Sequence, residues 1–177
     1  GYEAVERCDL LLVTHGHSDH TADVVAIARD SHAQVIAPYE LSVIFQQKGL
    51  KNVVGMNPGG TFRPFAAESP HGGLAVTMVP AVHSSSYEVD GKMAYAGVAT
   101  GYVMTFEDGV VAYYAGDTSI FSDMKLIGDL YRPSIAFLPI GDLFTMGPEQ
   151  AAHAVGLLGV TQVVPMHYGT FPLLTGT

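Results

Sequence analysis

Three histidines and one aspartate lie within six positions near the start of this chain, in the run His15-Gly16-His17-Ser18-Asp19-His20. Neutral imidazole rings and carboxylates are the ligands that Zn²⁺, Mn²⁺ and Fe²⁺ accept in proteins. A hydrophobic core cannot hold so many polar rings side by side unless their nitrogen atoms find partners. We therefore interpret the run as a metal site. The alternative is a polar surface loop with scattered histidines.

Residues with further metal-binding side chains occur later in the sequence: His83, Asp117 and His167. In the His-rich loop the first two rings can turn toward one point, while Asp19 and His20 can face a second point nearby. Two metal ions about 3.5–4 Å apart can share a water molecule whose pKa falls toward neutrality, which supplies hydroxide at physiological pH. The spacing is therefore compatible with a binuclear centre.

Asp117 is the candidate bridge between two such metals. Gly116 before it lets the backbone come close, and Thr118 after it could hold the carboxylate in place. Asp142 follows another expected strand, where it could orient a ligand or contact substrate, or simply cap a helix or close a loop. Tyr168, next to His167, could donate a hydrogen bond to a developing oxyanion or form an aromatic wall.

Short β-rich runs alternate with helical patterns, which indicates a layered α/β fold. We expect strands over 9–14, 34–37, 51–56, 74–80, 95–106, 110–115, 134–139 and 162–166. We expect helices over 21–30, 38–48, 121–131 and 148–158, the first of them capped by Ser18 or Thr21. The candidate ligands each follow the end of an expected strand, where layered α/β folds place their sites.

The composition limits the function classes. The 177 residues suit one domain over 1–177, and 48% apolar against 14% charged residues favours a compact fold. A net charge of −9 disfavours nucleic-acid and anionic-membrane partners, and no apolar run approaches the ~20 residues that a bilayer requires. With Cys8 as the single cysteine, no internal disulfide can form, and we expect a cytoplasmic protein.

The run 14–20 resembles the signature loop of the metallo-β-lactamase superfamily, and His83, 116–118 and 165–168 follow in that family's order. Four stretches are similar to its bacterial and archaeal branch of metal-dependent hydrolases, whose relatives include ascorbate-6-phosphate lactonase: 121–128, 138–142, 144–148 and 167–172. The resemblance spans nearly the whole chain and implies an αββα sandwich.

The resemblance also implies how the ligands are shared. One metal would be held by His15, His17 and His83, the other by Asp19, His20 and His167, with Asp117 between them. We expect two divalent metal ions, Zn²⁺ first and Mn²⁺ or Fe²⁺ as alternatives, because nitrogen and oxygen ligands do not choose among them.

Two departures from the family concern the ends. Its members usually have two or more strands before the His-rich loop and a further helix at the end, so this chain resembles a domain that lacks its opening strands and final helix. A sheet without those strands exposes an edge that invites pairing. We therefore expect a homo-oligomer whose partner copy covers that edge.

The expected function is hydrolysis of a small-molecule lactone or other carboxylic ester by a hydroxide bridging two metals. Asp19, or a group that holds one of the ligands, would help to orient the hydroxide and to move its proton, Asp117 would bridge the two metals, and Tyr168 could stabilise the oxyanion. A phosphodiester substrate is the runner-up, and a non-catalytic metal-binding module is the rival from another class. Ser84, Ser85 and Ser86 could line the pocket, whereas His32, His71 and His153 are expected outside the site.

Overall fold

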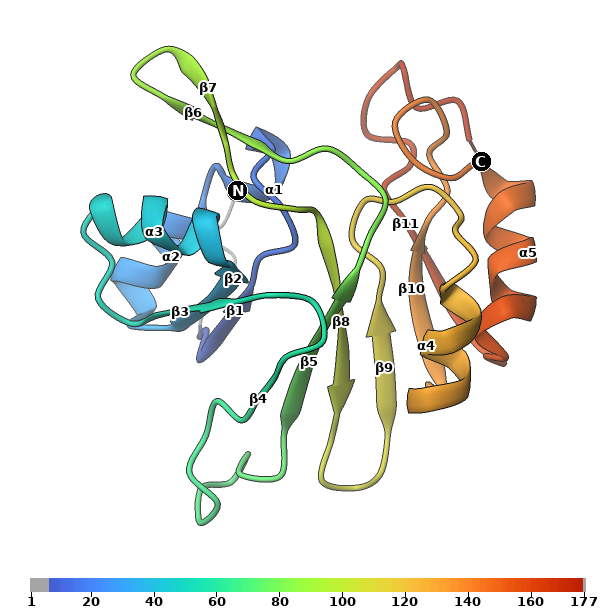
Figure 1. Cartoon of the computed structure of the whole chain (residues 1–177), viewed down its shortest axis with the longest axis horizontal. Coiled ribbons are helices and arrows are strands. Elements are labelled where there is room, and N and C mark those ends of the chain that lie inside the picture. Colours follow the sequence, from blue (N-terminus) through green and yellow to red (C-terminus); the bar gives the residue numbers. More distant parts are fainter. Residues whose placement is uncertain (1–6, 177) are drawn as a thin grey trace. The chain divides into compact units, whose positions relative to one another are not determined.

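The computed structural model describes residues 7–176, and their contacts group into two compact units. Unit 1 comprises residues up to Asn57 together with Ser84–Ala99, and unit 2 comprises Pro58–His83 together with the chain from Thr100. Each unit contains helices and strands (Figure 1), which confirms the α/β class. The single domain expected over 1–177 stays a prediction.

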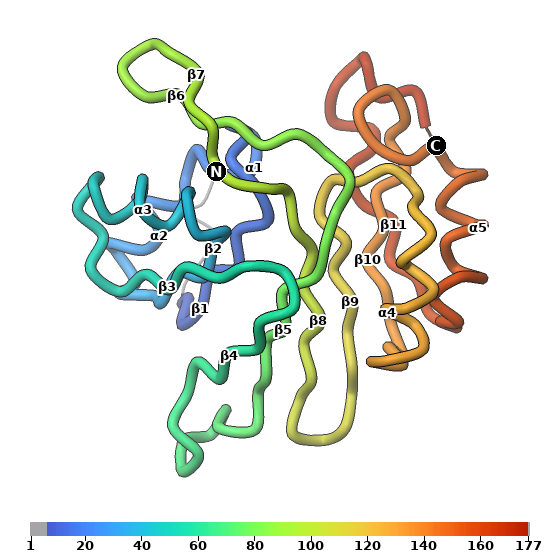
Figure 2. The backbone as a smooth tube through the Cα atoms, viewed as in Figure 1, coloured from blue at the N-terminus to red at the C-terminus, as the bar shows by residue number. Residues whose placement is uncertain are grey.

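Unit 1 is built on a parallel sheet in the order β1-β2-β3. Its elements are β1 (Leu10–Leu12), α1 (Ser18–Thr21), α2 (Val24–Ser31), β2 (Gln34–Pro38), α3 (Tyr39–Gln47), β3 (Val53–Met56) and the antiparallel hairpin β6 (Ser86–Val89) with β7 (Lys92–Tyr95). In the central strand, Val35, Ile36 and Ala37 are fully buried, as expected when a parallel sheet is covered on both faces. The hairpin is the pale green loop of the backbone trace in Figure 2.

Unit 2 is built on a six-stranded sheet in the order β11-β10-β9-β8-β5-β4. Its elements are β4 (Thr61–Phe62), β5 (Ala75–Pro80), β8 (Thr100–Thr105), β9 (Val111–Tyr114), α4 (Met124–Tyr131), β10 (Ile135–Pro139), α5 (Pro148–Leu158) and β11 (Gln162–Met166). Strand β8 is antiparallel to both β5 and β9, whereas β10 is parallel to β9 and β11. The carboxyl ends of β5, β9, β10 and β11 therefore meet at one edge of this sheet.

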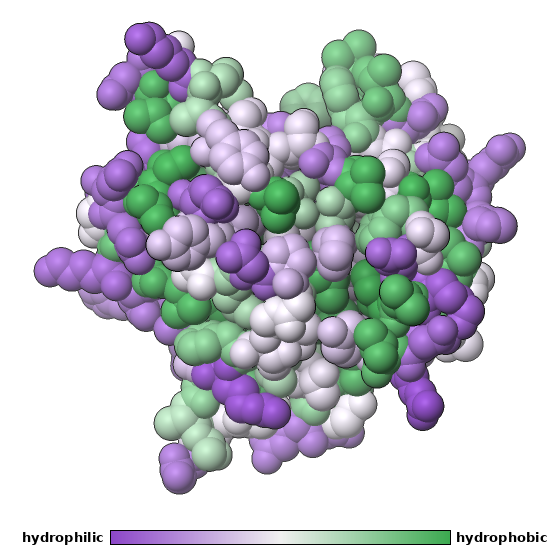
Figure 3. Space-filling model, in the orientation of Figure 1, coloured by the Kyte–Doolittle hydropathy of each residue, from purple (hydrophilic) through white to green (hydrophobic). Residues whose placement is uncertain are grey.

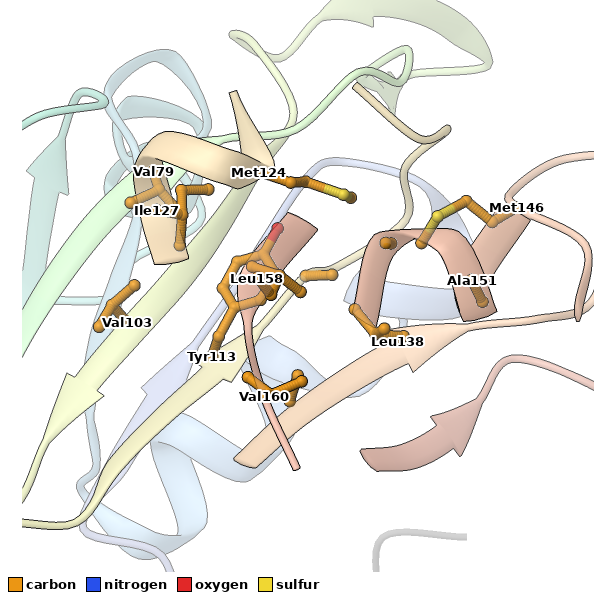
Figure 4. Close-up of a cluster of buried hydrophobic side chains, with 13 residues drawn as sticks. Val79, Val103, Tyr113, Met124, Ile127, Leu138, Met146, Ala151, Leu158 and Val160 are labelled. Atoms are coloured by element: carbon orange, nitrogen blue, oxygen red, sulfur yellow. The ribbon is translucent and has the colours of Figure 1, made fainter. Parts of the chain in front are cut away.

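The hydrophobic core of unit 2 lies between its sheet and the helices α4 and α5. Figure 4 shows Tyr113 of β9 and Leu138 of β10 among side chains that include Met124 of α4 and Leu158 of α5. This packing fixes the strands whose ends carry candidate ligands, so the edge of the sheet is a rigid platform.

Several expected elements differ from the structure. The helix expected over 21–30 is divided into α1 and α2, and the strand expected over 95–106 is interrupted between β7 and β8. Neither Ser18 nor Thr21 is an N-cap, since His17 and Asp23 occupy those positions. The Thr21 hydroxyl instead donates to the Gly16 and His17 carbonyls, because a threonine can bond backwards within a turn. Strands β4 and β6 had no counterpart in the sequence analysis.

The surface mixes polar and apolar side chains, as Figure 3 shows for one face. Exposed apolar side chains include Met93 and Tyr95 of β7. Among residues 7–176, none of the helices combines the length and the apolar character needed to cross a bilayer.

Candidate metal centre

The His-rich loop of unit 1 joins β1 to α1 and gathers its imidazole rings. The Nε2 atom of His15 lies 3.0 Å from Nδ1 of His17. The ring of His20 lies 4.2 Å from that of His15 between centroids, and its Nε2 atom lies 3.3 Å from a carboxylate oxygen of Asp19. His15 is fully buried. The loop, which carries His15 and His17, and helix α1, which carries Asp19 and His20, therefore bring together the four predicted ligands of unit 1.

The loop is held against the segment that opens the β6–β7 hairpin. The Gly16 N–H donates to Oγ of Ser85 over 3.1 Å, and that hydroxyl donates to the Ala96 carbonyl over 3.3 Å. A Cβ atom at position 16 would lie 2.7 Å from the Ser86 carbonyl oxygen and 2.7 Å from Cβ of Ala96. Glycine is thus required between the first two histidines, because the hairpin backbone approaches so closely.

Unit 2 gathers the other three predicted ligands at one edge of its sheet. The same carboxylate oxygen of Asp117, Oδ2, lies 3.1 Å from Nε2 of His167 and 3.7 Å from Nε2 of His83. These residues follow β9, β11 and β5, whose carboxyl ends share that edge. The Asp117 side chain is only 4% exposed, so water screens these contacts little.

Local backbone geometry explains how Asp117 reaches this position. Gly116 has φ 64°, a left-handed conformation that other residues adopt only at a cost. The Thr118 hydroxyl accepts the Val82 N–H over 3.0 Å and donates to the Ser119 carbonyl over 2.7 Å. The Ser119 N–H in turn donates to the Val82 carbonyl. Thr118 therefore holds the loop before His83, and its expected hold on the Asp117 carboxylate stays a prediction.

The charge of Asp117 also acts on β9. Burial, and secondly the negative charge of Asp117, raise the pKa of Tyr114 above its ordinary value. The phenol of Tyr114 therefore stays protonated and uncharged beside the negative charge of Asp117. The ring of Tyr114 lies 5.9 Å from that of Phe137 on the adjacent strand β10.

The remaining candidates lie in turns or on helices. Asp142 follows β10 with φ 62°, its N–H donates to the Met146 carbonyl, and its carboxylate accepts from Thr175 over 3.5 Å. These contacts suit the loop role. Tyr168 directly follows His167 and is 42% exposed, so its two proposed roles stay predictions.

The other histidines have ordinary positions. His32 is the left-handed C-cap residue of α2, and His71 lies 5.5 Å from the ring of Phe65. His153 is an exposed residue of α5.

A groove of about 370 Å³ lies beside the His-rich loop within unit 1. Its lining residues are Gly16, His17, Ser18, Asp19, Thr21, Ala22, Ser86, Tyr87, Glu88 and Met93. The contribution of the hairpin residues 87, 88 and 93 to this groove was not expected from the sequence, since strand β6 was not predicted. The sequence signal that could have indicated this part of the groove is the run of three serines after His83.

Residues 2–168 match a family model described as beta-lactamase superfamily domain. The chain is 51% identical over 170 residues to a UPF0173 metal-dependent hydrolase of Rubrobacter xylanophilus, covering 96% of this chain and 67% of that protein. It is 49% identical to another of Methanopyrus kandleri, covering 93% and 68%.

Solved structures give the same likeness. Igni18, a metallo hydrolase from the archaeon Ignicoccus hospitalis, is 40% identical with a TM-score of 0.84, over 99% of this chain and 70% of that one. A metal-dependent hydrolase of Parabacteroides distasonis is 28% identical with a TM-score of 0.67, over 98% and 71%. The likeness thus extends over nearly the whole of this chain and about two thirds or more of these relatives.

Proposed function

This chain belongs to the beta-lactamase superfamily and, within it, to the metal-dependent hydrolases, and from that premise we propose that it hydrolyses a lactone or another carboxylic ester of a small molecule. The observation that carries the proposal is the convergence of two imidazoles on one buried carboxylate oxygen, with His83 and His167 both facing Asp117. Such a nitrogen and oxygen donor set suits borderline divalent metals.

The donor set of both units fits two divalent metal ions, Zn²⁺ first and Mn²⁺ or Fe²⁺ as alternatives. We assign His15, His17 and His83 to one ion and Asp19, His20 and His167 to the other, with Asp117 shared. When bound, such ions lower the pKa of a water molecule and polarise the bond that is cleaved. In the His-rich loop, Nε2 of His15 and Nδ1 of His17 lie 3.0 Å apart, and this closeness supports their assignment to one ion.

Three side chains would act on the substrate and on the attacking water. The carboxylate of Asp19 is the group that orients the water and accepts its proton, and it lines the groove beside the loop. Asp117 fixes the ligand geometry through its contacts to the two histidines. The phenol of Tyr168 would donate a hydrogen bond to the oxygen on which negative charge develops.

The groove supports a neutral ester more than a phosphodiester. It presents the carboxylates of Asp19 and Glu88 and the apolar surfaces of Tyr87 and Met93, and none of its described lining residues is Lys or Arg. An anionic phosphodiester would meet the negative charge of Glu88 there, since the charge of Asp19 would be offset by the ion that it helps to hold, whereas an uncharged acyl or alcohol group would pack against the apolar wall. A phosphodiester remains the second candidate, because the same metal pair serves both reactions.

Metal analysis followed by an assay on a lactone, an aryl ester and a bis-aryl phosphodiester tests the proposal. We expect metal to co-purify or to bind stoichiometrically, and the lactone or ester to be turned over. His15→Ala and Asp117→Ala should lose metal and turnover, while His153→Ala on α5 should keep both. Turnover of the phosphodiester alone would overturn the substrate class, and bound metal with no turnover would favour the non-catalytic module.

Two further expectations belong to the same proposal. A homo-oligomer is supported by the edge strand β11, where Val163 and Val164 are each 38% exposed. Light scattering that gives a strictly monomeric mass would contradict it. A cytoplasmic location is supported by the single cysteine of the sequence.

A further inference from the structure

We infer that Thr14 and Ser84 are positioning residues that accept the ring N–H groups of His15 and His17 in the metal-bound protein, and so stabilise the opposite tautomers whose facing nitrogens bind the ion. The inference rests on the proposed metal centre and adds two hydroxyl groups that hold its first ligands. Both hydroxyls and both rings belong to unit 1.

The four side chains form a row of short contacts. The Thr14 Oγ1 atom lies 3.0 Å from Nδ1 of His15, and Ser84 Oγ lies 3.3 Å from Nε2 of His17. Between the rings, Nε2 of His15 lies 3.0 Å from Nδ1 of His17. Each ring therefore has one nitrogen turned toward the other ring and one turned toward a hydroxyl.

A neutral imidazole carries one N–H and one lone pair, and a metal ion binds only the lone pair. For both facing nitrogens to bind the same ion, His15 must carry its proton on Nδ1 and His17 must carry its proton on Nε2. These are the two nitrogens that face hydroxyl oxygens, which can accept an N–H. A hydroxyl can also donate, so it fits either tautomer while the facing nitrogens share a hydrogen bond in the metal-free protein. Once an ion takes both facing lone pairs, each hydroxyl can only accept, and the two hydroxyls therefore stabilise the metal-bound pair of tautomers, which are opposite in the two rings.

The two contacts differ in their shielding from water. Thr14 is 4% exposed and His15 is fully buried, whereas Ser84 is exposed. A water molecule can replace the serine hydroxyl at its exposed position, but it reaches the threonine position poorly. Loss of the Thr14 hydroxyl should therefore weaken metal binding more than loss of the Ser84 hydroxyl.

Four variants separate the hydroxyl group from the volume of the side chain. Thr14→Val and Ser84→Ala remove the hydroxyl, while Thr14→Ser and Ser84→Thr keep it. Ser31→Ala is the matched control within unit 1, because its hydroxyl bonds only within α2, to the Ile27 carbonyl over 2.6 Å. The readouts are Zn²⁺ affinity by competition with a chromophoric chelator and ring-nitrogen NMR of the Zn²⁺-bound protein, which reports on the Nδ1–H group of His15 and the Nε2–H group of His17.

We expect Zn²⁺ affinity to fall about 10–100-fold in Thr14→Val and by less in Ser84→Ala, the scale typical of groups that orient metal ligands. Thr14→Ser, Ser84→Thr and the control should stay close to the parent protein. In the NMR spectra, Thr14→Val should change the Nδ1–H signal of His15, and Ser84→Ala should change the Nε2–H signal of His17, because each N–H loses its acceptor.

Unchanged affinity and unchanged ring N–H signals in Thr14→Val and Ser84→Ala would overturn the inference. If Thr14→Val does not fold, Ser84→Ala at its exposed position decides, and an unchanged Nε2–H signal of His17 there counts against the proposal. Neither readout needs a substrate. A protein that shows these effects but hydrolyses none of the panel would refute the proposed function alone, whereas metal retained in His15→Ala would refute the centre itself.

Discussion

Replacing Tyr113 by phenylalanine should stabilise unit 2. Tyr113 is fully buried in the core between the sheet and its helices, and its hydroxyl is without a hydrogen-bond partner among the described residues (Figure 4). A buried hydroxyl that leaves water without a partner costs about 1–3 kcal/mol. Phenylalanine keeps the ring and its packing and loses only the oxygen, so we expect the free energy of unfolding to rise by about 1 kcal/mol.

The stabilisation expected for Tyr113→Phe should be larger at high pH. Burial raises the pKa of Tyr113, so its phenol stays protonated in the folded state while the unfolded chain ionises near pH 10. Since the unfolded state then binds fewer protons than the folded state, this tyrosine lowers stability by about 1.4 kcal/mol for each pH unit above 10. Tyr113→Phe removes that loss, and its advantage at pH 11 should be about 2.4 kcal/mol.

Urea denaturation at pH 7 and at pH 11 measures both quantities. The matched control is Tyr102→Phe on the adjacent strand β8, because Tyr102 is equally buried but its hydroxyl is hydrogen-bonded to Thr100. This control should lower the free energy of unfolding at pH 7 by about 0.5–1.5 kcal/mol. A loss of stability in Tyr113→Phe at pH 7 equal to that in the control would refute the reasoning, since it would mean that the hydroxyl has a partner.

Three other substitutions test the packing, the loop and the groove. Gly128→Ala in α4 should destabilise, because a Cβ atom there would overlap the Leu158 carbonyl, whereas Gly156→Ala in α5 meets open space and should stabilise by about 0.5–1 kcal/mol in thermal denaturation. Gly116→Ala, at φ 64°, should cost about 1–2 kcal/mol and reduce metal content by elemental analysis. Glu88→Lys in the groove should raise kcat/KM for an anionic ester relative to a neutral one. An unchanged ratio of the two substrates would remove this carboxylate from specificity.

The helices and strands whose ends are marked by local residue signals, such as a proline in the first turn, could be predicted from the sequence. The structure confirms α5 at 148–158 and β11 at 162–166, because Pro148 fits the first turn of a helix and the following strand is a compact apolar run. The strand over 95–106 was wrong in its first part, since the apolar pattern continues where the backbone leaves β7 and enters β8. An apolar run in the sequence does not reveal whether a neighbouring strand is present to pair with.

The candidate site likewise has contacts that could be predicted from the sequence and contacts that could not. That His83, Asp117 and His167 would gather could be predicted, because parallel strands deliver their ends to one edge of a sheet. The hydroxyl contacts could not, since Ser84 and His17 are separated by 67 positions and no local rule pairs them. Thr21 was expected to cap a helix but bonds to loop carbonyls, a choice between partners that only the folded loop decides.

The number of residues between the end of a strand and its ligand explains the strained backbone of His167. His15, His83 and Asp117 are each the third residue after the last residue of β1, β5 and β9, so two intervening residues can turn the backbone. His167 has no such lead, because it directly follows β11, and it adopts φ 54°, which an L-residue takes only at a cost. Such strain persists where the surroundings determine it and function requires it. The histidine at this position therefore carries a backbone cost that its contact with the buried carboxylate of Asp117 helps to offset.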